Sequence, residues 1–330
     1  TIDNETSAFG QLGPHNILAA VESLGYRCDG RLLALNSYEN RVYQIGIEDA
    51  APLVGKFYRP GRWSDEGIQE EHDFSRELSE LEIPVVPALA DIDGRTLHRY
   101  GRFRFALYPR RGGRVLDLES PDQLEQMGRF VARIHNAGAL KPFAHRPTLR
   151  VEHFGVESYQ YLLEAGFIPA DQEISYRSLA EDLIVQIRAC FERAGSPVYL
   201  RLHGDCHAGN ILWSEAGPHL VDLDDARMGP AVQDLWMFLS GDREHMTARL
   251  GDVLEGYTQF RDFDARELHL IEPLRTLRMM HYAAWLARRW ADPAFPRAFP
   301  YFNTQRYWGE HILSLREQAA LMSEPPLVWD

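Results

Sequence analysis

The residues best suited to chemistry lie between positions 203 and 225. Asp205 is followed five residues later by Asn210, and Asp222 comes twelve residues after Asn210. Carboxylate and amide oxygens are ligands that Mg²⁺ prefers, and a few of them suffice when water and substrate phosphates complete the shell. In phosphoryl transfer the protein mainly aligns the acceptor and neutralises charge. The spacing therefore favours transfer of phosphate from ATP to a hydroxyl group, with Asp205 as the proton acceptor and with Asn210 and Asp222 as Mg²⁺ ligands.

The charge of this region makes a divalent cation necessary. Two further carboxylates, Asp224 and Asp225, follow Asp222 closely. Like charges about 4 Å apart repel by roughly 4 kcal/mol at an effective dielectric constant near 20. We expect these carboxylates to face the phosphates of the nucleotide, so the complex should scarcely form without Mg²⁺.

A hydrolase with a transition metal is the competing interpretation. His203, Asp205 and His207 stand at alternate positions, and all three side chains are plausible metal ligands. However, residues 199–203 read as an apolar strand entering a turn, and residues 210–213 read as another strand leaving it. This frame favours a catalytic loop, in which His203 would hydrogen-bond the loop backbone and His207 would border the acceptor site.

An upstream segment could supply the phosphate-binding lysine of a nucleotide site. Residues 53–58 alternate as a strand does and contain Lys56. Residues 68–81 form an amphipathic helical pattern, in which either Glu70 or Glu71 could pair with Lys56. We favour Glu71 because it lies beside the apolar face of the predicted helix. The alternative is a solvated acidic helix face.

Two more segments could contact a nucleotide. No glycine-rich G-x-G-x-x-G motif precedes the Lys56 strand, but residues 35–43 contain Ser37 and Asn40, whose side chains can donate hydrogen bonds to phosphate oxygens. Farther along, backbone groups around Ala106 and Tyr108 could bind the edge of adenine. An ordinary hairpin turn and a plain connecting strand are the alternatives for these two segments.

The motifs together resemble the bacterial stress response kinase A family, which sits among the aminoglycoside-phosphotransferase and choline-kinase-like folds. The resemblance extends from about residue 30 nearly to the C-terminus. It is carried by the segments NSYENRVYQ (36–44), KFYRP with RW (56–63), HRPT (145–148), LRLHGDCHAGNILW (200–213), VDLDDA (221–226), GPAVQDLWM (229–237) and WADPAFP (290–296).

The resemblance implies a cytoplasmic serine/threonine protein kinase that requires ATP and Mg²⁺, autophosphorylates and counters stress-induced death. It also implies that Asp205 is the proton acceptor, that Asn210 and Asp222 bind magnesium, and that Ser37 lies at the ATP site. A protein acceptor is implied by the resemblance alone, because relatives on the same fold phosphorylate small alcohols. A small-molecule kinase for aminoglycoside-, choline- or homoserine-like hydroxyls therefore stays open. A non-catalytic nucleotide-binding scaffold is a further alternative, although the joint presence of Asp205, Asn210 and Asp222 speaks against it.

Composition sets the remaining expectations. With 35 Lys and Arg against 48 Asp and Glu, the 330-residue chain carries a formal net charge of −13, which disfavours nucleic acid and anionic membranes as partners. Cys28, Cys190 and Cys206 are widely spaced and suggest neither a disulfide framework nor a zinc site. No apolar run approaches the roughly 20 residues that span a bilayer. We expect a cytoplasmic protein and take a monomer as the working hypothesis.

The predicted fold is α+β and two-lobed, like that of protein kinases. Residues 1–106 are expected to form a small N-lobe with an antiparallel sheet, which binds the nucleotide, and residues 107–330 a mainly helical C-lobe, which carries the catalytic loop and binds metal and substrate. Two residues of the C-lobe are given structural roles: Asp234 should brace the catalytic loop through backbone N–H groups, and His135 should be a hydrogen-bonded core histidine. Helical patterns in this lobe cover residues 121–138, 176–194, 233–239, 252–260, 267–290 and 304–322.

Overall fold

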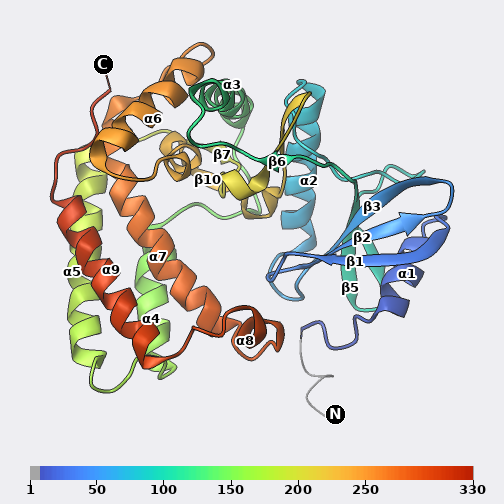
Figure 1. Cartoon of the computed structure of the whole chain (residues 1–330), viewed down its shortest axis with the longest axis horizontal. Helices are drawn as coiled ribbons and strands as arrows, with labels where there is room; N and C mark the ends of the chain where they lie inside the picture. The colour runs from blue at the N-terminus through green and yellow to red at the C-terminus, as the bar shows by residue number, and fades with distance from the viewer. Residues whose placement is uncertain (1–7, 330) are drawn as a thin grey trace. The chain divides into compact units, whose positions relative to one another are not determined.

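The computed structural model describes residues 8–329, and the chain divides into two compact units (Figure 1). The first, here called the sheet unit, comprises the chain up to Leu116 together with Phe143–Arg146 and Gly209–Ala226. The second, the helical unit, comprises Asp117–Pro142, Pro147–Ala208 and the chain from Arg227 onward.

A five-stranded antiparallel sheet in the order β1-β2-β3-β5-β4 forms the centre of the sheet unit. Neighbouring residues of a strand face opposite sides of a sheet. Phe57 and Phe105 are paired across β3 and β5 and are fully buried on one side, whereas Lys56 and Ala106, one position away, are paired on the other. The strands are β1 (Cys28–Leu35), β2 (Arg41–Ile47), β3 (Ala50–Phe57), β4 (His98–Tyr100) and β5 (Phe103–Pro109).

Two helices bury the apolar residues of this sheet. Helix α1 (Pro14–Glu22) packs Ile17 and Val21 into the cluster that contains Phe57. Helix α2 (Asp65–Glu80) begins at Ser64, whose hydroxyl accepts a hydrogen bond from the backbone N–H of Gly67, as a helix cap does. The predicted helix of residues 68–81 is thus confirmed, with an earlier start.

A small second sheet in the same unit has the order β6-β8-β9, with β6 (Arg114–Val115), β8 (Ile211–Ser214) and β9 (Gly217–Leu220). Strands β8 and β9 form a hairpin in which Ile211 pairs with Leu220. Asn210 immediately precedes this hairpin and Asp222 follows it by two residues. The hairpin therefore brings together two polar residues that are twelve positions apart in the sequence.

Helices dominate the helical unit, in which α4, α5, α7 and α9 lie side by side (Figure 1). The short strands β7 (Tyr199–Leu202) and β10 (Arg227–Pro230) pair antiparallel in the same unit, and β7 contacts α3. The helices are α3 (Pro121–Gly138), α4 (Glu157–Glu164), α5 (Glu173–Ala194), α6 (Arg243–Tyr257), α7 (Ile271–Arg288), α8 (Ala294–Ala298) and α9 (Gln305–Met322), with a π-helical turn η1 (Glu152–Val156) before α4 and a 3₁₀ turn η6 (Ala265–Leu270) before α7.

Two helix predictions in this unit need correction. Residues 233–239 form parts of the 3₁₀ turns η4 (Ala231–Asp234) and η5 (Trp236–Phe238), not one helix. The side chains of Gln233 and Asp234 bond the backbone of residues 203 and 204, and such side-chain bonds compete with helix formation. Helix α6 covers Arg243–Tyr257, nine residues ahead of the predicted start, because the side chain of Asp242 caps it.

Helices α3 and α6 approach each other closely through glycines. A Cβ atom at Gly256 would lie 1.8 Å from the carbonyl oxygen of Glu125, and one at Gly128 would lie 2.0 Å from the carbonyl oxygen of Val253. Backbone atoms cannot move aside as the end of a flexible side chain can. Glycine at these two positions therefore permits the contact between the helices.

Within residues 8–329, no helix combines the length and apolarity that crossing a membrane requires.

The close contact predicts opposite effects for two glycines of α6. Gly256→Ala should destabilise the protein by about 2 kcal/mol through overpacking. Gly251→Ala, on the same helix but with nothing within 4 Å of the added Cβ, should stabilise it by roughly 0.5–1 kcal/mol through helix propensity. Urea unfolding of both variants checks this, and equal shifts would show that the helices do not depend on the glycine contact.

Candidate active site

A cavity of about 340 Å³ lies within the sheet unit. Val54, Lys56 and Tyr108 line it from β3 and β5. Successive side chains of a strand face opposite sides of the sheet, which explains why these three residues face the cavity. Their neighbours Phe57 and Leu107 face the other side and belong to the apolar cluster around α1. The predicted site residues that line the cavity are Ser37, Lys56, Glu71, Tyr108, Asn210 and Asp222.

Two predicted nucleotide contacts do not line this cavity. Ala106 is fully buried and packs with Tyr58 and Ile68. Asn40 is also buried; its side-chain amide donates to Oδ2 of Asp224 over 2.9 Å, while its side-chain oxygen accepts from the backbone N–H of Arg59 over 3.0 Å. The structure thus places the Asn40 side chain in a protein network beside the cavity.

Asn210 and Asp222 meet at the open end of the β8–β9 hairpin. The backbone N–H of Val221 donates to the carbonyl oxygen of Asn210 over 2.9 Å, and both predicted ligands line the cavity. Asp222 has a φ of 59° and a ψ of 68°, in the left-handed region that few residues other than Gly adopt. Backbone strain of this kind is common at functional sites, because it fixes the direction of a side chain.

Lys56 bonds the carboxylates that follow this hairpin. Its Nζ lies 3.1 Å from Oδ1 of Asp222 and 3.4 Å from Oδ1 of Asp224. Burial alone would lower the pKa of Lys56, but the two carboxylates outweigh it and raise that pKa well above its usual value. Lys56 is therefore a fixed positive charge in the wall of the cavity.

Asp224 has a different environment from the one the sequence suggested. Its side chain is only 5% exposed and is surrounded by cations, so it does not add a repulsive charge toward a polyphosphate as we expected. Burial would raise the pKa of Asp224, but Lys56, Arg62 and Arg146 hold it far below its usual value. Asp224 is therefore a buried anion that organises the residues around it.

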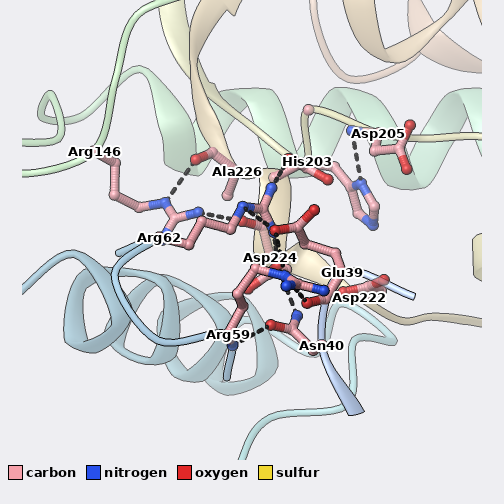
Figure 2. Close-up of polar contacts among 12 residues, drawn as sticks. Glu39, Asn40, Arg59, Arg62, Arg146, His203, Asp205, Asp222, Asp224 and Ala226 are labelled. Carbon is pink, nitrogen blue, oxygen red and sulfur yellow. Dashed lines mark hydrogen bonds and ion pairs between the residues drawn. The ribbon is translucent and has the colours of Figure 1, made fainter. Parts of the chain in front are cut away.

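Two arginines complete this network (Figure 2). Arg62 forms an ion pair with Asp224 and a second one, over 2.8 Å, with Asp225. Arg146 donates to the carbonyl oxygens of Asp224, Ala226 and Gly67 over 2.5, 2.6 and 2.8 Å. The two guanidinium groups thereby tie the segment after Asp222 to helix α2.

The neighbouring glutamates of α2 have separate roles. Glu70 accepts hydrogen bonds from the backbone N–H groups of residues 144, 145 and 146 over 2.6–2.9 Å, so it is committed to this turn. Glu71 lines the cavity, but the expected ion pair with Lys56 is not formed, since Lys56 binds Asp222 and Asp224 instead. Burial raises the pKa of Glu71 to about 7, against the opposing charges of Lys56 and Arg146.

Asp205 lies in the loop after β7, in the helical unit. His207 Nε2 lies 3.3 Å from its Oδ2, and Arg278 of α7 donates to its Oδ1 over 2.5 Å. Burial would raise the pKa of Asp205, but His207 and Arg278 hold it well below its usual value. Nδ1 of His203 accepts from the backbone N–H of Asp205 over 3.4 Å, as expected for a histidine that holds the loop (Figure 2).

A buried network positions this loop. The carboxylate of Asp234 accepts from the backbone N–H groups of His203 and Gly204, both over 2.9 Å, which confirms that Asp234 braces the loop. His135 Nε2 lies 3.0 Å from Asp234, and His135 Nδ1 lies 2.8 Å from the hydroxyl of Tyr257. The prediction of a hydrogen-bonded structural histidine at position 135 is therefore confirmed.

Sequence reasoning missed the arginines that hold these carboxylates. Arg62, Arg146 and Arg278 are 162, 78 and 73 positions away from their partners. Local periodicity cannot reveal contacts at such separations. The sequence offered one indication: Arg62 and Arg146 both lie in segments that carry the family resemblance. It did not indicate which residues they bind.

The chain matches the model of the phosphotransferase enzyme family over residues 31–271. It is 44% identical over 326 residues to stress response kinase A of Escherichia coli K12, covering 99% of this chain and 98% of that protein. It is 42% identical, at the same coverage, to a Salmonella typhimurium protein named serine/threonine protein kinase RdoA. The chain belongs to the phosphotransferase enzyme family, within the group of stress response kinases A, and the hydrolase interpretation is set aside.

Solved structures support the fold. An amicoumacin kinase in complex with AMP-PNP and Ca²⁺ has a TM-score of 0.72 at 18% identity and covers 94% of both chains. A microcompartment-associated aminopropanol kinase has a TM-score of 0.71 at 17% identity, covering 93% of this chain and 96% of that one. The prediction of an α+β kinase-like fold, with a small antiparallel sheet and a mainly helical remainder, is confirmed.

The raised pKa of Glu71 predicts a pH dependence of stability. Folding favours the protonated carboxyl, so this stabilisation is complete below about pH 4.5 and is lost as the pH rises through about 7, with a total near 3 kcal/mol. Glu71→Gln should remove this loss. Urea unfolding between pH 4.5 and 8 measures the difference from the wild type, with the exposed Glu80→Gln of the same helix as the control; parallel curves for wild type and Glu71→Gln would refute the assignment.

The Asp224 network predicts that Arg62 matters more than a surface arginine. Arg62→Gln leaves a buried carboxylate partly uncompensated and should destabilise the protein by about 3 kcal/mol. Arg95→Gln, which breaks exposed ion pairs with Asp91 and Asp93 in the same unit, should cost less than about 1 kcal/mol. Thermal unfolding of both variants provides the comparison, and similar costs would contradict the central role of Asp224.

Proposed function

We propose that the protein is a cytoplasmic serine/threonine protein kinase that uses ATP and Mg²⁺, autophosphorylates and acts in the response to stress. The observation that carries this proposal is the convergence of Lys56, Asn210 and Asp222 on one cavity of the sheet unit. The name of the Salmonella relative, a serine/threonine protein kinase, supports a protein acceptor.

We keep the predicted division of labour as part of this proposal. Residues 1–106 would bind the nucleotide, and residues 107–330 would supply the catalytic loop, the metal ligands and the acceptor site. Residues 209–226 belong to the second range by sequence but pack with the sheet unit. Asn210 and Asp222, the proposed metal ligands, therefore lie in the same unit as Lys56.

The residues at the cavity fit Mg²⁺. Asn210 and Asp222 offer one amide and one carboxylate oxygen donor, which is the chemistry that this hard cation prefers. Mg²⁺ bound there would neutralise charge on the phosphates. Asp222, with a side chain that is 53% exposed, is accessible for this role, whereas Asp224 is enclosed by protein cations.

The remaining residues of the chain would position the reactants. Lys56 would bind phosphate oxygens in place of its present carboxylate partners, with Ser37 adding a hydrogen bond and Glu71 close by. Backbone groups near Tyr108, which lines the cavity, would bind adenine; the neighbouring Ala106 side chain is buried behind it. Asp205 would take the proton of the acceptor hydroxyl as the hydroxyl oxygen bonds to the γ-phosphorus and the bond from that phosphorus to ADP breaks.

A small-molecule kinase is the second candidate. Solved structures with the same fold include an aminopropanol kinase and a spectinomycin phosphotransferase. Phosphate transfer from radiolabelled ATP to dephosphorylated casein and to the chain itself, compared with transfer to aminopropanol and choline, separates the two candidates. Transfer to the small alcohols alone would refute the protein-kinase proposal.

Substitution of Asp205 and of Asp222 should have different effects on phosphate transfer and on nucleotide binding. Asp205→Asn should lower the transfer rate by about 10²–10⁴-fold, the usual contribution of a general base, and keep the binding of AMP-PNP with Mg²⁺. Asp222→Asn should weaken that Mg²⁺-dependent binding itself. Calorimetry with and without Mg²⁺, alongside the transfer assay, measures both effects.

Autophosphorylation and nucleotide binding, measured in both variants, test the proposed roles separately. Autophosphorylation detected by mass spectrometry should disappear in Asp205→Asn although the nucleotide still binds. Equal loss of nucleotide binding in the two variants would show that Asp205 does not act on the acceptor. Full transfer activity in Asp205→Asn would show that another group accepts the proton of the hydroxyl.

A further inference from the structure

Arg278 of α7 bonds Asp205 from outside the catalytic loop, and its side chain is open to solvent. It donates from Nη1 to Oδ1 of Asp205, and 44% of its side chain is exposed. Within residues 8–329, its guanidinium forms no other hydrogen bond or ion pair. A cation with unused donors therefore stands next to the carboxylate to which the acceptor hydroxyl must come.

The geometry of a guanidinium group suits a second anion. Arginine carries five N–H donors in a planar fork, of which the contact with Asp205 uses one. The remaining edge can bind a carboxylate through two parallel hydrogen bonds. Arg278 could thus hold Asp205 and an anionic group of the acceptor at the same time, without releasing either.

Two aromatic residues and a second arginine follow Arg278 on the same side of α7. Tyr282, Trp285 and Arg289 lie four, seven and eleven residues beyond it, with Arg289 at the C-cap. Trp285 and Arg289 are half-buried, and Trp285 packs on Phe295. Residues 278–289 contain no Asp or Glu, in a chain with a formal net charge of −13. Tyr282 is 39% exposed, and its hydroxyl lies 3.3 Å from that of Tyr301. Arg278, Tyr282, Trp285 and Arg289 are here called the α7 stripe.

We infer that Arg278 selects acceptors by charge: the protein segment that is phosphorylated carries an Asp or Glu close to its Ser or Thr, and this carboxylate binds Arg278 while the hydroxyl approaches Asp205. This inference rests on the proposed kinase function and names the class of substrate for the same site. Because Arg278 bonds Asp205 directly, a carboxylate bound to Arg278 and a hydroxyl at Asp205 belong to residues that are a few positions apart. The rest of the segment would lie along the α7 stripe.

Charge also disfavours the opposite class of acceptor. A cationic acceptor such as choline would bring its positive charge next to Arg278, and like charges at contact distance repel. Removal of Arg278 should reduce this penalty. Arg278 should therefore raise kcat/KM for acidic acceptors and lower it for cationic ones.

The test uses the full-length protein and three peptides that share one Ser in an otherwise uncharged sequence. One peptide carries Glu three residues after the Ser, one carries Gln and one carries Lys at that position, and a parallel set places the residue three positions before the Ser. Glycerate and choline serve as an anionic and a cationic small alcohol. The value of kcat/KM is measured for wild type, Arg278→Gln, Arg278→Glu and the control Arg306→Gln, a surface arginine of α9 that is paired with Glu310.

The wild type and Arg306→Gln should prefer one Glu peptide over its Gln counterpart by about tenfold, the scale of one charge-assisted hydrogen bond. Arg278→Gln should lose this preference, and Arg278→Glu should prefer the Lys peptide. A structural role of Arg278 would lower all rates together and leave the ratios unchanged, which would overturn the inference. A preference for the Lys peptide in the wild type would do the same.

The peptide assays and the small-alcohol assays together distinguish failure of the inference from failure of the proposed function. Transfer to glycerate but to no peptide would refute the protein-kinase proposal while keeping the charge selection by Arg278. Preferential transfer to choline would refute the charge selection. Hydrolysis of ATP without transfer to any of these acceptors would also contradict charge selection by Arg278, because the acidic acceptors would be present but would not be phosphorylated.

Discussion

The ion pairs of the buried Asp224 carboxylate are the interaction on which the proposed nucleotide site depends. A carboxylate with 5% of its side chain exposed is stable only when cations and hydrogen-bond donors surround it. Lys56, Arg62 and Asn40 supply these contacts from three different segments. Their positions are therefore set by one anion: the network fixes the lysine of β3, the loop before β2 and the segment after β3 relative to the end of the β8–β9 hairpin.

In the proposed function, this arrangement would couple the binding of phosphate and metal. Lys56 bonds both Asp222 and Asp224, so phosphates would compete with Asp222 for the lysine, and a divalent cation would compete with the lysine for Asp222. Phosphate binding would draw Lys56 away from Asp222 and so favour the metal, and metal binding would draw Asp222 away from Lys56 and so favour phosphate. Reciprocal coupling of this kind follows from thermodynamic linkage, and it makes the proposed requirement for Mg²⁺ a property of the shared ion pair as well as of phosphate charge. Asp224 is also paired with Arg62, so a change of partner by Lys56 would not leave this buried carboxylate without a cation.

Sequence patterns predicted the parts of the site that are set by local structure. The alternation of residues 53–58 places Lys56 on the cavity side of the sheet, and the short hairpin between Asn210 and Asp222 brings these two residues together. The roles of Asn40, Asp224 and Glu70 could not be predicted in the same way, because each depends on partners 74–184 positions away. The segment 233–239 shows the same limit, since apolar spacing indicated a helix where side-chain bonds to a distant loop favour 3₁₀ turns.

The distribution of arginines explains how a chain with a net charge of −13 can operate on anionic phosphates. Surface carboxylates contribute to the net charge, but the carboxylates at the two candidate sites have their own cations: Lys56 and Arg62 at Asp224, and Arg278 at Asp205. Local charge, and not net charge, decides which ligand can approach, because exposed charges beyond about 10 Å are largely screened at physiological ionic strength. The two cationic groups differ in one respect. Arg62 is 18% exposed and committed to protein carboxylates, whereas Arg278 is 44% exposed with donors to spare, so the first stabilises the fold and the second is available to a substrate.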